Sequence, residues 1–205
     1  MLLDFNNLIK KYNMDITGVI HIGGHYGEEH KLYLKNNIKN IVYFEPLKDN
    51  FSKLQENVDS ETLLYNIALG SYKGQTEMFV ETVNNGQSSS ILEPKLHKIQ
   101  YPHIIFNKKE TVNIDLLDNI NLENKYNMIN IDVQGYELEV FKGATNTLKN
   151  VKYIISEINR DELYENCVHI EELENYLKQF GFKLIEQSWD GGTWGDGLFI
   201  KIQQK

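Results

Sequence analysis

The feature that most constrains the fold of this chain is a regular alternation of short apolar segments with segments of helical spacing. Apolar runs rich in Ile and Val are typical of strands that are buried on both faces of a sheet. Such runs predict strands at 18–22, 41–44, 62–65, 128–133 and 151–158. Helical spacing at 28–37 and 47–58 separates the first three of these strands. A βαβα order of this kind forms a mostly parallel sheet with helices on both faces.

The C-terminal part of the chain predicts a different connection. A helix over 171–180 ends at Gly181, and strands follow at 182–188 and 198–202. A flexible turn over 190–197 joins these two strands, which we expect to pair as an antiparallel hairpin. The fold expected is therefore an α/β sheet of seven strands, closed by this hairpin.

Length and composition indicate one domain. The chain has 205 residues, 41% of them apolar or aromatic, which is enough for one hydrophobic core but hardly for two. We therefore expect a single domain over 1–205. Within it, the stretch 84–109 contains Asn-Asn-Gly, three serines and two of the three prolines, and has no clear periodicity. This pattern predicts a long surface loop, and a lid over a substrate is one physical use of such a loop.

The charge pattern excludes some partners. The formal net charge is −8, and acids and bases are interspersed, so no basic stripe favours nucleic acid as a partner. The segment 1–15 is too polar and too short for a signal peptide or a spanning helix. We therefore expect a cytoplasmic protein without membrane insertion, and the sequence carries no signal for an oligomeric state. Cys167 is alone, which excludes an internal disulfide and a CxxC metal cluster.

Glycines between the first strand and the next helix indicate a ligand site. Gly23, Gly24 and Gly27 allow bare backbone to approach a ligand at a helix N-terminus, although such turns also occur in folds that bind nothing there. Glu45 ends the next strand at about the 20-residue spacing where an acid binds ribose hydroxyls. The alternative is that Glu45 merely flanks the helix that follows Pro46.

The spacing of the glycines favours a ligand without phosphate. A dinucleotide turn has the pattern GxGxxG, whose second and third glycines let the pyrophosphate and the helix approach. Here three residues separate Gly23 from Gly27, and His25 and Tyr26 lie in the middle of the turn. This arrangement favours a ligand such as a methionine tail over a pyrophosphate.

Blocks of sequence in consistent order resemble the motifs of FkbM-family methyltransferases, over about Gly18 to Ile200. They are 19–27, Phe44-Glu45-Pro46 followed by Asn50-Phe51 and Leu54, 66–70, 87–92 and 131–144. The resemblance implies a Rossmann-like class I methyltransferase fold, S-adenosylmethionine as cofactor and a small-molecule or glycan acceptor. It implies a cofactor site formed by His21, Gly23, Gly24, His25, Gly27, Glu45, Pro46, Asn66, Ile67 and Asp132, with Asn66 beside adenine.

Two positions depart from the family pattern. His21 stands where the family usually has an acid, and His25 stands where it often has Asn. Loss of the acid weakens the expected grip on the methionine ammonium. His21 is either a core histidine bonded to backbone or a group that changes charge near neutral pH.

Two carboxylates are the candidates for the chemical step. Methyl transfer to an alcohol requires close alignment and removal of the hydroxyl proton. Asp132 and Glu157 lie near the ends of neighbouring predicted strands, where reacting groups gather in open α/β sheets. The alternatives are that Asp132 caps the helix beginning near Tyr136 and that Glu157 pairs with Arg160.

An oxygen-rich set, Asp132, Glu157 and Asn159, resembles the divalent-ion ligands of some O-methyltransferases. Oxygen ligands suit Mg²⁺. Spacing alone does not bring the three side chains together, so a divalent metal is the alternative and the prediction is a site without metal.

The candidates for binding the acceptor lie in or near the long loop. Ser89 and Ser90 belong to its serine-rich segment, and His97 and His103 are either acceptor ligands, a base, or surface histidines. Trp194 offers an aromatic face to a sugar ring, although hairpin packing explains it nearly as well.

Together these patterns predict an S-adenosylmethionine-dependent O-methyltransferase that acts on a sugar hydroxyl of a glycan or glycoconjugate. One alternative is a nicotinamide-dependent sugar oxidoreductase that uses the same glycines and Glu45, although the chain lacks GxGxxG and an evident Tyr-x-x-x-Lys pair. The other is a non-catalytic nucleoside-binding module of the same fold, to which His21 in place of an acid would be suited.

Overall fold

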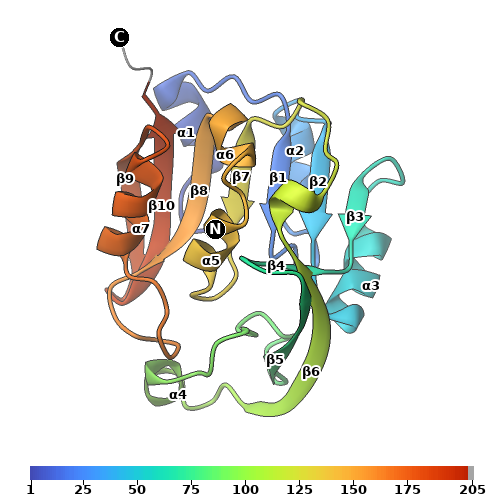
Figure 1. The fold of residues 1–205 in the computed structure, drawn as a ribbon, viewed down its shortest axis with the longest axis vertical. Coiled ribbons are helices and arrows are strands. Elements are labelled where there is room, and N and C mark those ends of the chain that lie inside the picture. The colour runs from blue at the N-terminus through green and yellow to red at the C-terminus, as the bar shows by residue number, and fades with distance from the viewer. Residues whose placement is uncertain (203–205) are drawn as a thin grey trace.

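The computed structural model, which describes residues 1–202, contains a seven-stranded sheet with the order β3-β2-β1-β7-β8-β10-β9 (Figure 1). All its pairs are parallel except those of β10, which is antiparallel to β8 and β9. The strands are β1 (Val19–Ile22), β2 (Ile41–Phe44), β3 (Leu63–Tyr65), β7 (Met128–Ile131), β8 (Tyr153–Asn159), β9 (Phe182–Asp190) and β10 (Trp194–Lys201). The predicted seven-stranded sheet and its C-terminal hairpin are therefore confirmed.

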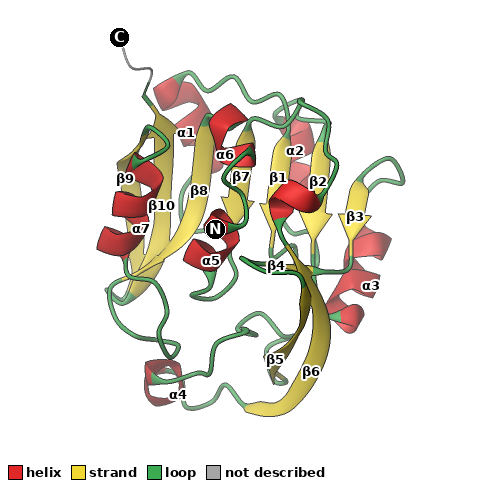
Figure 2. Ribbon diagram, in the orientation of Figure 1, coloured by secondary structure: helices red, strands yellow, loops and turns green. Residues whose placement is uncertain are grey.

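Helices cover both faces of this sheet (Figure 2). They are α1 (Phe5–Tyr12), α2 (His30–Lys35), α3 (Lys48–Asn57), α5 (Glu137–Lys142), α6 (Thr147–Asn150) and α7 (Ile170–Lys178). Successive side chains of a strand point to opposite faces, so each central strand contributes to two cores. One core joins Ile20, Phe44, Ile129 and Ile154 to α5, α6 and α7, and the other joins Val19, Tyr43, Met128 and Ile155 to α1, α2 and α3.

The helices are short, and α1 was not predicted. Asp4 caps its N-terminus by accepting from the backbone N–H of Asn7 at 3.1 Å, and Asn13 ends it in a left-handed conformation. Phe5 and Leu8 bury its apolar face in the core of α2 and α3. Within residues 1–202, none of the helices combines the length and the apolar character that crossing a bilayer requires.

A second sheet, with the order β4-β6-β5, extends beyond the main sheet at the end where β1 and β2 finish (Figure 1). Its strands are β4 (Ala68–Leu69), β5 (Gly74–Glu81) and β6 (Phe106–Asp115), and η1 (Leu117–Asn119) follows it. The sequence did not predict β5 or β6, because both are half exposed and carry charged residues instead of a continuous apolar run.

The loop predicted over 84–109 is shorter in the structure, because regular elements occupy part of this stretch. β6 already begins at Phe106, α4 (Leu96–Gln100) lies inside the stretch, and Ser90 forms an isolated bridge with Phe79. The prediction of a surface loop that extends to Lys109 is therefore wrong at its C-terminal end. The cause is that Lys108 and Lys109 are both exposed, in a strand whose pairing partner, β5, was itself not predicted.

The central strand β7 provides a test of the core. Ile129 is fully buried between its neighbours, and replacing it with Ala removes apolar contacts and leaves a cavity. We expect Ile129→Ala to lower the free energy of unfolding by about 2–5 kcal/mol, measured by urea denaturation. Ile99→Ala in α4 is the matched control, since Ile99 is 73% exposed and should change stability by less than about 0.5 kcal/mol. Equal losses in the two variants would contradict this core.

Candidate functional site

Two adjoining cavities open at the carboxyl edge of the parallel strands. Gly23 follows β1, Glu45 follows β2 and Asp132 follows β7, so pairing of these strands brings the three positions to one edge. The apolar cavity, as we call the first, is lined by Glu45 and by Phe44, Ile67, Leu69, Met78, Val133 and Tyr136 among others. The acidic cavity, the second, is lined by Glu28, Glu29, Asp132, Glu157 and Asp196 among others. Both include Gly23, His25, Gln87, Asp132 and Gln134 in their walls.

The glycine turn lies where the two cavities meet. Gly23 has φ +80°, and a Cβ added there would lie 1.9 Å from the carbonyl oxygen of Asp132. Its N–H and that of Gly24 both donate to the carbonyl of Phe44 at 3.0 Å, which fixes the turn against β2. Only glycine fits this position, so bare backbone faces the cavities.

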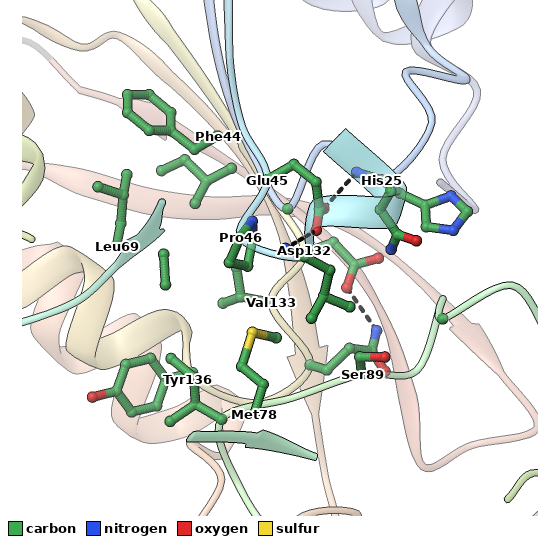
Figure 3. Close-up of a pocket in the computed structure, with 18 of the residues that line it drawn as sticks. His25, Phe44, Glu45, Pro46, Leu69, Met78, Ser89, Asp132, Val133 and Tyr136 are labelled. Atoms are coloured by element: carbon green, nitrogen blue, oxygen red, sulfur yellow. Dashed lines mark hydrogen bonds between the residues drawn. The ribbon is translucent and has the colours of Figure 1, made fainter. Parts of the chain in front are cut away.

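Glu45 ties the end of β2 to the glycine turn (Figure 3). The carboxylate is 5% exposed and accepts from the backbone N–H groups of His25 and Leu47, each at 2.9 Å. Burial raises the pKa of Glu45 to about 7, against the opposing effect of these two bonds. Each carboxylate oxygen keeps a further lone pair, so Glu45 can accept from a vicinal diol in the apolar cavity. Its bond to Leu47, which precedes α3, shows that it also flanks the helix.

Of the remaining residues predicted to bind the cofactor, some line a cavity and others lie outside its walls. Pro46 and Ile67 line the apolar cavity with Glu45. Asn66 lines neither cavity, since its amide donates to the backbone carbonyls of Glu45 and Pro46 at 2.9 Å and thereby holds the turn after β2. Gly27 lies on neither wall and has φ +76°.

Several residues that line the apolar cavity were not predicted as site residues. Leu69, Met78, Val133 and Tyr136 surround the apolar cavity (Figure 3). Met78 belongs to β5, a strand that was not predicted because it has no continuous apolar run. Val133 and Tyr136 lie in the turn after β7. Apolar walls with one carboxylate at the rim suit a ligand made of an aromatic ring and a diol.

Asp132 and Glu157 are brought together by a residue that the sequence analysis did not assign to the site. The Gln134 side-chain amide donates to Asp132 Oδ1 at 2.7 Å and to Glu157 Oε2 at 2.6 Å. The hydroxyl of Tyr164 shares its hydrogen between Gln134 Oε1 at 2.7 Å and the Ser88 carbonyl at 2.8 Å, and this contact to Oε1 orients the amide hydrogens of Gln134 toward the carboxylates. Gln134 adopts φ 57°, a left-handed conformation that turns its side chain back between the two acids.

The two carboxylates differ in environment. Asp132 is exposed to both cavities, whereas Glu157 is 3% exposed and also accepts from the Asn159 amide at 3.2 Å. Burial, and secondly the charge of Asp132, raise the pKa of Glu157 well above its usual range. Glu157 is therefore suited to hold a proton beside the exposed Asp132.

The geometry does not support the two structural roles considered for these acids, an ion pair of Glu157 with Arg160 and a helix cap by Asp132. The guanidinium of Arg160 lies 3.6 Å from the ring centre of Trp189, and no salt bridge joins it to Glu157 within the described chain. Helix α5 begins after Tyr136 without a side-chain cap, so Asp132 is not its cap.

The candidate metal ligands are connected through hydrogen bonds. The Gln134 amide bonds Asp132 and Glu157, and Asn159 presents its amide nitrogen to Glu157. Among residues 1–202, no group of three or more His, Cys, Asp or Glu side chains is arranged to hold a metal ion.

His21 is a buried, neutral histidine on the wall of the acidic cavity. Asn130 donates to the hydroxyl of Tyr33 at 2.7 Å, and this hydroxyl lies 3.1 Å from His21 Nδ1. The hydroxyl therefore donates to Nδ1, which places the ring proton on Nε2. Burial lowers the pKa of His21, so the second reading, a change of charge near neutral pH, is not favoured. Its partner is a side chain and not the backbone that we expected.

His25 joins the glycine turn to the segment that follows β5. Its Nδ1 lies 2.6 Å from a carboxylate oxygen of Glu28, and its Nε2 lies 2.9 Å from the carbonyl oxygen of Asn85. Burial lowers the pKa of His25, but the bonds to Glu28 and Asn85 outweigh it and the net shift is upward.

A buried acid that was not predicted holds that same segment. Glu81 is 2% exposed and accepts from the backbone N–H groups of Val83 and Asn84, and from that of Gly86 at 2.8 Å. The turn after β7 uses the same device, since Glu137 is fully buried and accepts from the N–H groups of Val133 and Gly135 at 3.1 Å. Burial raises the pKa of Glu137 to about 7.

Most predicted acceptor residues lie on the cavity walls. His97, His103 and Trp194 line the acidic cavity, and Trp194 Nε1 donates to the hydroxyl of Tyr101 at 2.9 Å. His97 is 6% exposed, so the reading of a surface histidine is wrong for it. Ser89 lines the apolar cavity. Ser90 lies behind the wall, where its hydroxyl donates to the carbonyl of Gln134 at 2.8 Å.

Comparison with known sequences identifies relatives. The family model described as "Methyltransferase FkbM domain" matches residues 21–184. The hexuronic acid methyltransferase AglP of Haloferax volcanii is 32% identical over 123 residues, which are 58% of this chain and 47% of that protein. The 2-O-methyltransferase NoeI of Sinorhizobium fredii is 27% identical over 192 residues, 88% of this chain and 77% of its own length. The chain thus aligns with about half of the first relative.

Solved structures share the fold at low sequence identity. The magnesium protoporphyrin IX methyltransferase of Synechocystis PCC 6803 with bound SAM has a TM-score of 0.52 and 10% identity, covering 95% of this chain and 74% of that one. A putative S-adenosylmethionine-dependent methyltransferase of Listeria monocytogenes has a TM-score of 0.55 and 8% identity, covering 96% and 98%. The expected class I methyltransferase fold is confirmed.

The buried Glu45 makes stability depend on pH. Its pKa rises from 4.5 to about 7 on folding, so the folded state retains the proton longer, and stability falls as pH rises between these values. At about 1.4 kcal/mol per unit, the loss should be about 3 kcal/mol. We expect urea denaturation to show that stability falls between pH 4.5 and pH 8 by about 3 kcal/mol less in Glu45→Gln than in the wild type, since Glu137 and Glu157 still contribute their own losses in both. Glu77→Gln, at an exposed position of β5, should follow the wild type, and a Glu45→Gln variant that did so too would contradict the assignment.

Proposed function

Because the chain belongs to the FkbM methyltransferase family, we propose that it is an S-adenosylmethionine-dependent O-methyltransferase acting on a hydroxyl of a sugar in a glycan or glycoconjugate. The observation that carries the proposal is the meeting of two unlike cavities at Asp132. One cavity is apolar and has a carboxylate at its rim, and the other is acidic and partly aromatic. An exposed carboxylate at the junction is in place to act between two ligands.

The residues of the apolar cavity fit the nucleoside part of the cofactor. The adenine ring would lie between the apolar walls, with Glu45 accepting from the ribose hydroxyls. Gly23 is on the wall of both cavities, so the methionine part would lie against its bare backbone. When bound, S-adenosylmethionine supplies a methyl group whose bond to sulfur breaks, with the electron pair kept by sulfur, as a bond to the acceptor oxygen forms.

The acids at the junction divide the proton chemistry between them. Asp132 is exposed to the acidic cavity and accepts the proton of the acceptor hydroxyl. Gln134 holds Asp132 in place through the bond of 2.7 Å. Burial favours the protonated form of Glu157. In that form Glu157 places no second negative charge next to Asp132.

The acceptor would enter the acidic cavity. Trp194 and Tyr101 lie on its wall, and aromatic faces of this kind stack on sugar rings. The names of the two relatives, a hexuronic acid methyltransferase and a 2-O-methyltransferase, agree with a sugar acceptor. We assign the stretch 84–109, which contributes His97, His103 and Tyr101, as the substrate-side segment of a single domain over 1–205.

Family membership does not favour the oxidoreductase alternative, and the glycine turn gives no support for it either. A dinucleotide would require the second and third glycines of GxGxxG, whereas His25 occupies the turn and bonds across it to Glu28 and Asn85.

Cofactor binding tests the assignment of Glu45. Calorimetry should show micromolar binding of S-adenosylhomocysteine and no comparable binding of NAD. Glu45→Ala should weaken the former by about 1–2 kcal/mol because the ribose hydroxyls lose their acceptor. Glu77→Ala, at an exposed position of β5, should bind like the wild type. Tighter binding of NAD, or unchanged affinity in Glu45→Ala, would contradict the proposal.

The proposed base provides a separate test with labelled donor and a panel of glycans. Asp132→Asn should lower kcat at saturating donor at least about 100-fold, because the acceptor hydroxyl loses its proton acceptor. Asp49→Asn on α3 removes the same charge at an exposed position and should leave kcat unchanged. Full turnover by Asp132→Asn would show that Asp132 is structural.

A further inference from the structure

Hydrogen bonds and ring packing hold the His21 side chain in one orientation. Asn130 donates to the hydroxyl of Tyr33 at 2.7 Å, and this hydroxyl lies 3.1 Å from His21 Nδ1. The centres of the Tyr43 and Tyr33 rings lie 4.9 Å and 5.9 Å from that of the imidazole. All four side chains are buried, so the imidazole cannot turn without moving its neighbours. His21 therefore presents a fixed N–H donor at Nε2.

This donor reaches the acidic cavity without a partner from the chain. His21 is 4% exposed and lies on the cavity wall, and its Nε2 bonds to no group among residues 1–202. Nε2 is not sealed off, unlike Nδ1 of His97, which is enclosed and has no partner in the described chain. A buried donor that finds no acceptor lowers stability. The wall is therefore suited to a ligand atom that accepts a hydrogen bond from His21.

The position of His21 assigns that ligand atom to the methyl donor. His21 lies on β1, two residues before Gly23, and the proposed function places the methionine part of the cofactor against the backbone of Gly23. Trp194, on the proposed acceptor side, lies on β10, and β7 and β8 separate β10 from β1. The ligand group nearest His21 is therefore the amino-acid tail of the cofactor.

The backbone of the glycine turn has no free donors for this tail. All five N–H groups from Gly23 to Gly27 already donate to acceptors within the chain. These acceptors are two carbonyls and two carboxylates, those of Phe44, Gly24, Glu45 and Glu28. A carboxylate in the tail thus requires a side-chain donor, and His21 provides one beside the turn.

The acids near His21 are compatible with a zwitterionic tail. Burial lowers the pKa of His21, and the charges of Glu29, Asp132 and Glu28 oppose this effect from the same wall. Glu28 is bonded to His25 at 2.6 Å, and Glu29 lies 3.7 Å from the N-terminal amino group. The tail carries an ammonium group on the same carbon as its carboxylate, and this group offsets the charge of Asp132. The neutral imidazole then binds the carboxylate as a hydrogen-bond donor.

We propose that His21 binds the carboxylate of the methionine part through its Nε2 hydrogen. His21 stands where the FkbM family usually has an acid, so this chain offers a donor for the carboxylate at a position where an acid would favour the ammonium group. The inference rests on the proposed methyltransferase function and adds a residue that recognises the amino-acid end of the cofactor.

A pair of ligands isolates this bond. S-adenosyl-3-thiopropylamine differs from S-adenosylhomocysteine only by lacking the carboxylate, so the ratio of the two affinities reports what the protein gains from that group. We expect calorimetry on the wild type to show that S-adenosylhomocysteine binds at least about tenfold more tightly, as a hydrogen bond to a charged group should give.

Substitutions at His21 separate the donor from the shape of the side chain. His21→Asn keeps a polar group near Tyr33 but does not reach the position of Nε2, and should reduce the preference to within about twofold. His21→Asp has the shape of Asn with a negative charge, and should reverse the preference because it repels the carboxylate and attracts the ammonium group. His21→Gln places an amide nitrogen near the position of Nε2 and should keep most of the preference. His169→Asn, at an exposed position before α7, should match the wild type.

NMR on the wild type tests the contact without a substitution. In nitrogen-15 spectra, the His21 ring should carry its proton on Nε2, and the signal is assigned by its absence from His21→Gln. This proton should move downfield when S-adenosylhomocysteine binds and should stay in place when S-adenosyl-3-thiopropylamine binds. A signal that does not respond to S-adenosylhomocysteine overturns the inference.

The outcomes distinguish this inference from the function on which it rests. If both ligands bind the wild type equally, or the preference survives in His21→Asn, the inference is overturned and the methyltransferase remains. If neither ligand binds the wild type, the proposed cofactor is wrong and the inference falls with it. Loss of structure in a variant weakens both ligands together and leaves their ratio unchanged, and if His21→Asn does not fold, the NMR signal of the wild type decides.

Discussion

The site depends on one close approach between two backbone turns. The strands β1 and β7 pair in parallel, so the turns that follow them meet, and the N–H of Asp132 donates to the carbonyl of Ile22 at 3.0 Å. Gly23 then passes so near the Asp132 carbonyl that a side chain would overlap it. This contact fixes Asp132 at the boundary of the two cavities. The apolar cavity lies toward β2 and the acidic cavity toward β8, because strand order places those neighbours on opposite sides.

Buried glutamates shape the turns around this contact. Glu45, Glu81 and Glu137 each accept backbone N–H groups of a separate turn, where a loop without regular pairing would leave those groups unsatisfied. Burial of the charge opposes this arrangement and raises the pKa of Glu45 and Glu137. The loops therefore gain defined shapes at some cost in stability, which is common where a site must be held ready for ligands.

The sequence predicts the main sheet well because its strands bury both faces, so an apolar run such as 41–44 is sufficient evidence. It predicts β5 and β6 poorly because they pair mainly with each other and leave charged side chains in solvent. Positions directly after strands, such as Glu45 and Asp132, follow from the order of elements. Gln134 does not, since its role depends on a left-handed turn.

The bond between His25 and the Asn85 carbonyl has a kinetic consequence. Gly86, Gln87 and Ser89 lie on the wall of the apolar cavity, so the segment that His25 holds forms part of that wall. Movement of this segment away from the glycine turn breaks the bond to His25 and displaces this part of the wall. Loop motions next to a ligand site set the overall rate in many enzymes whose chemical step is fast.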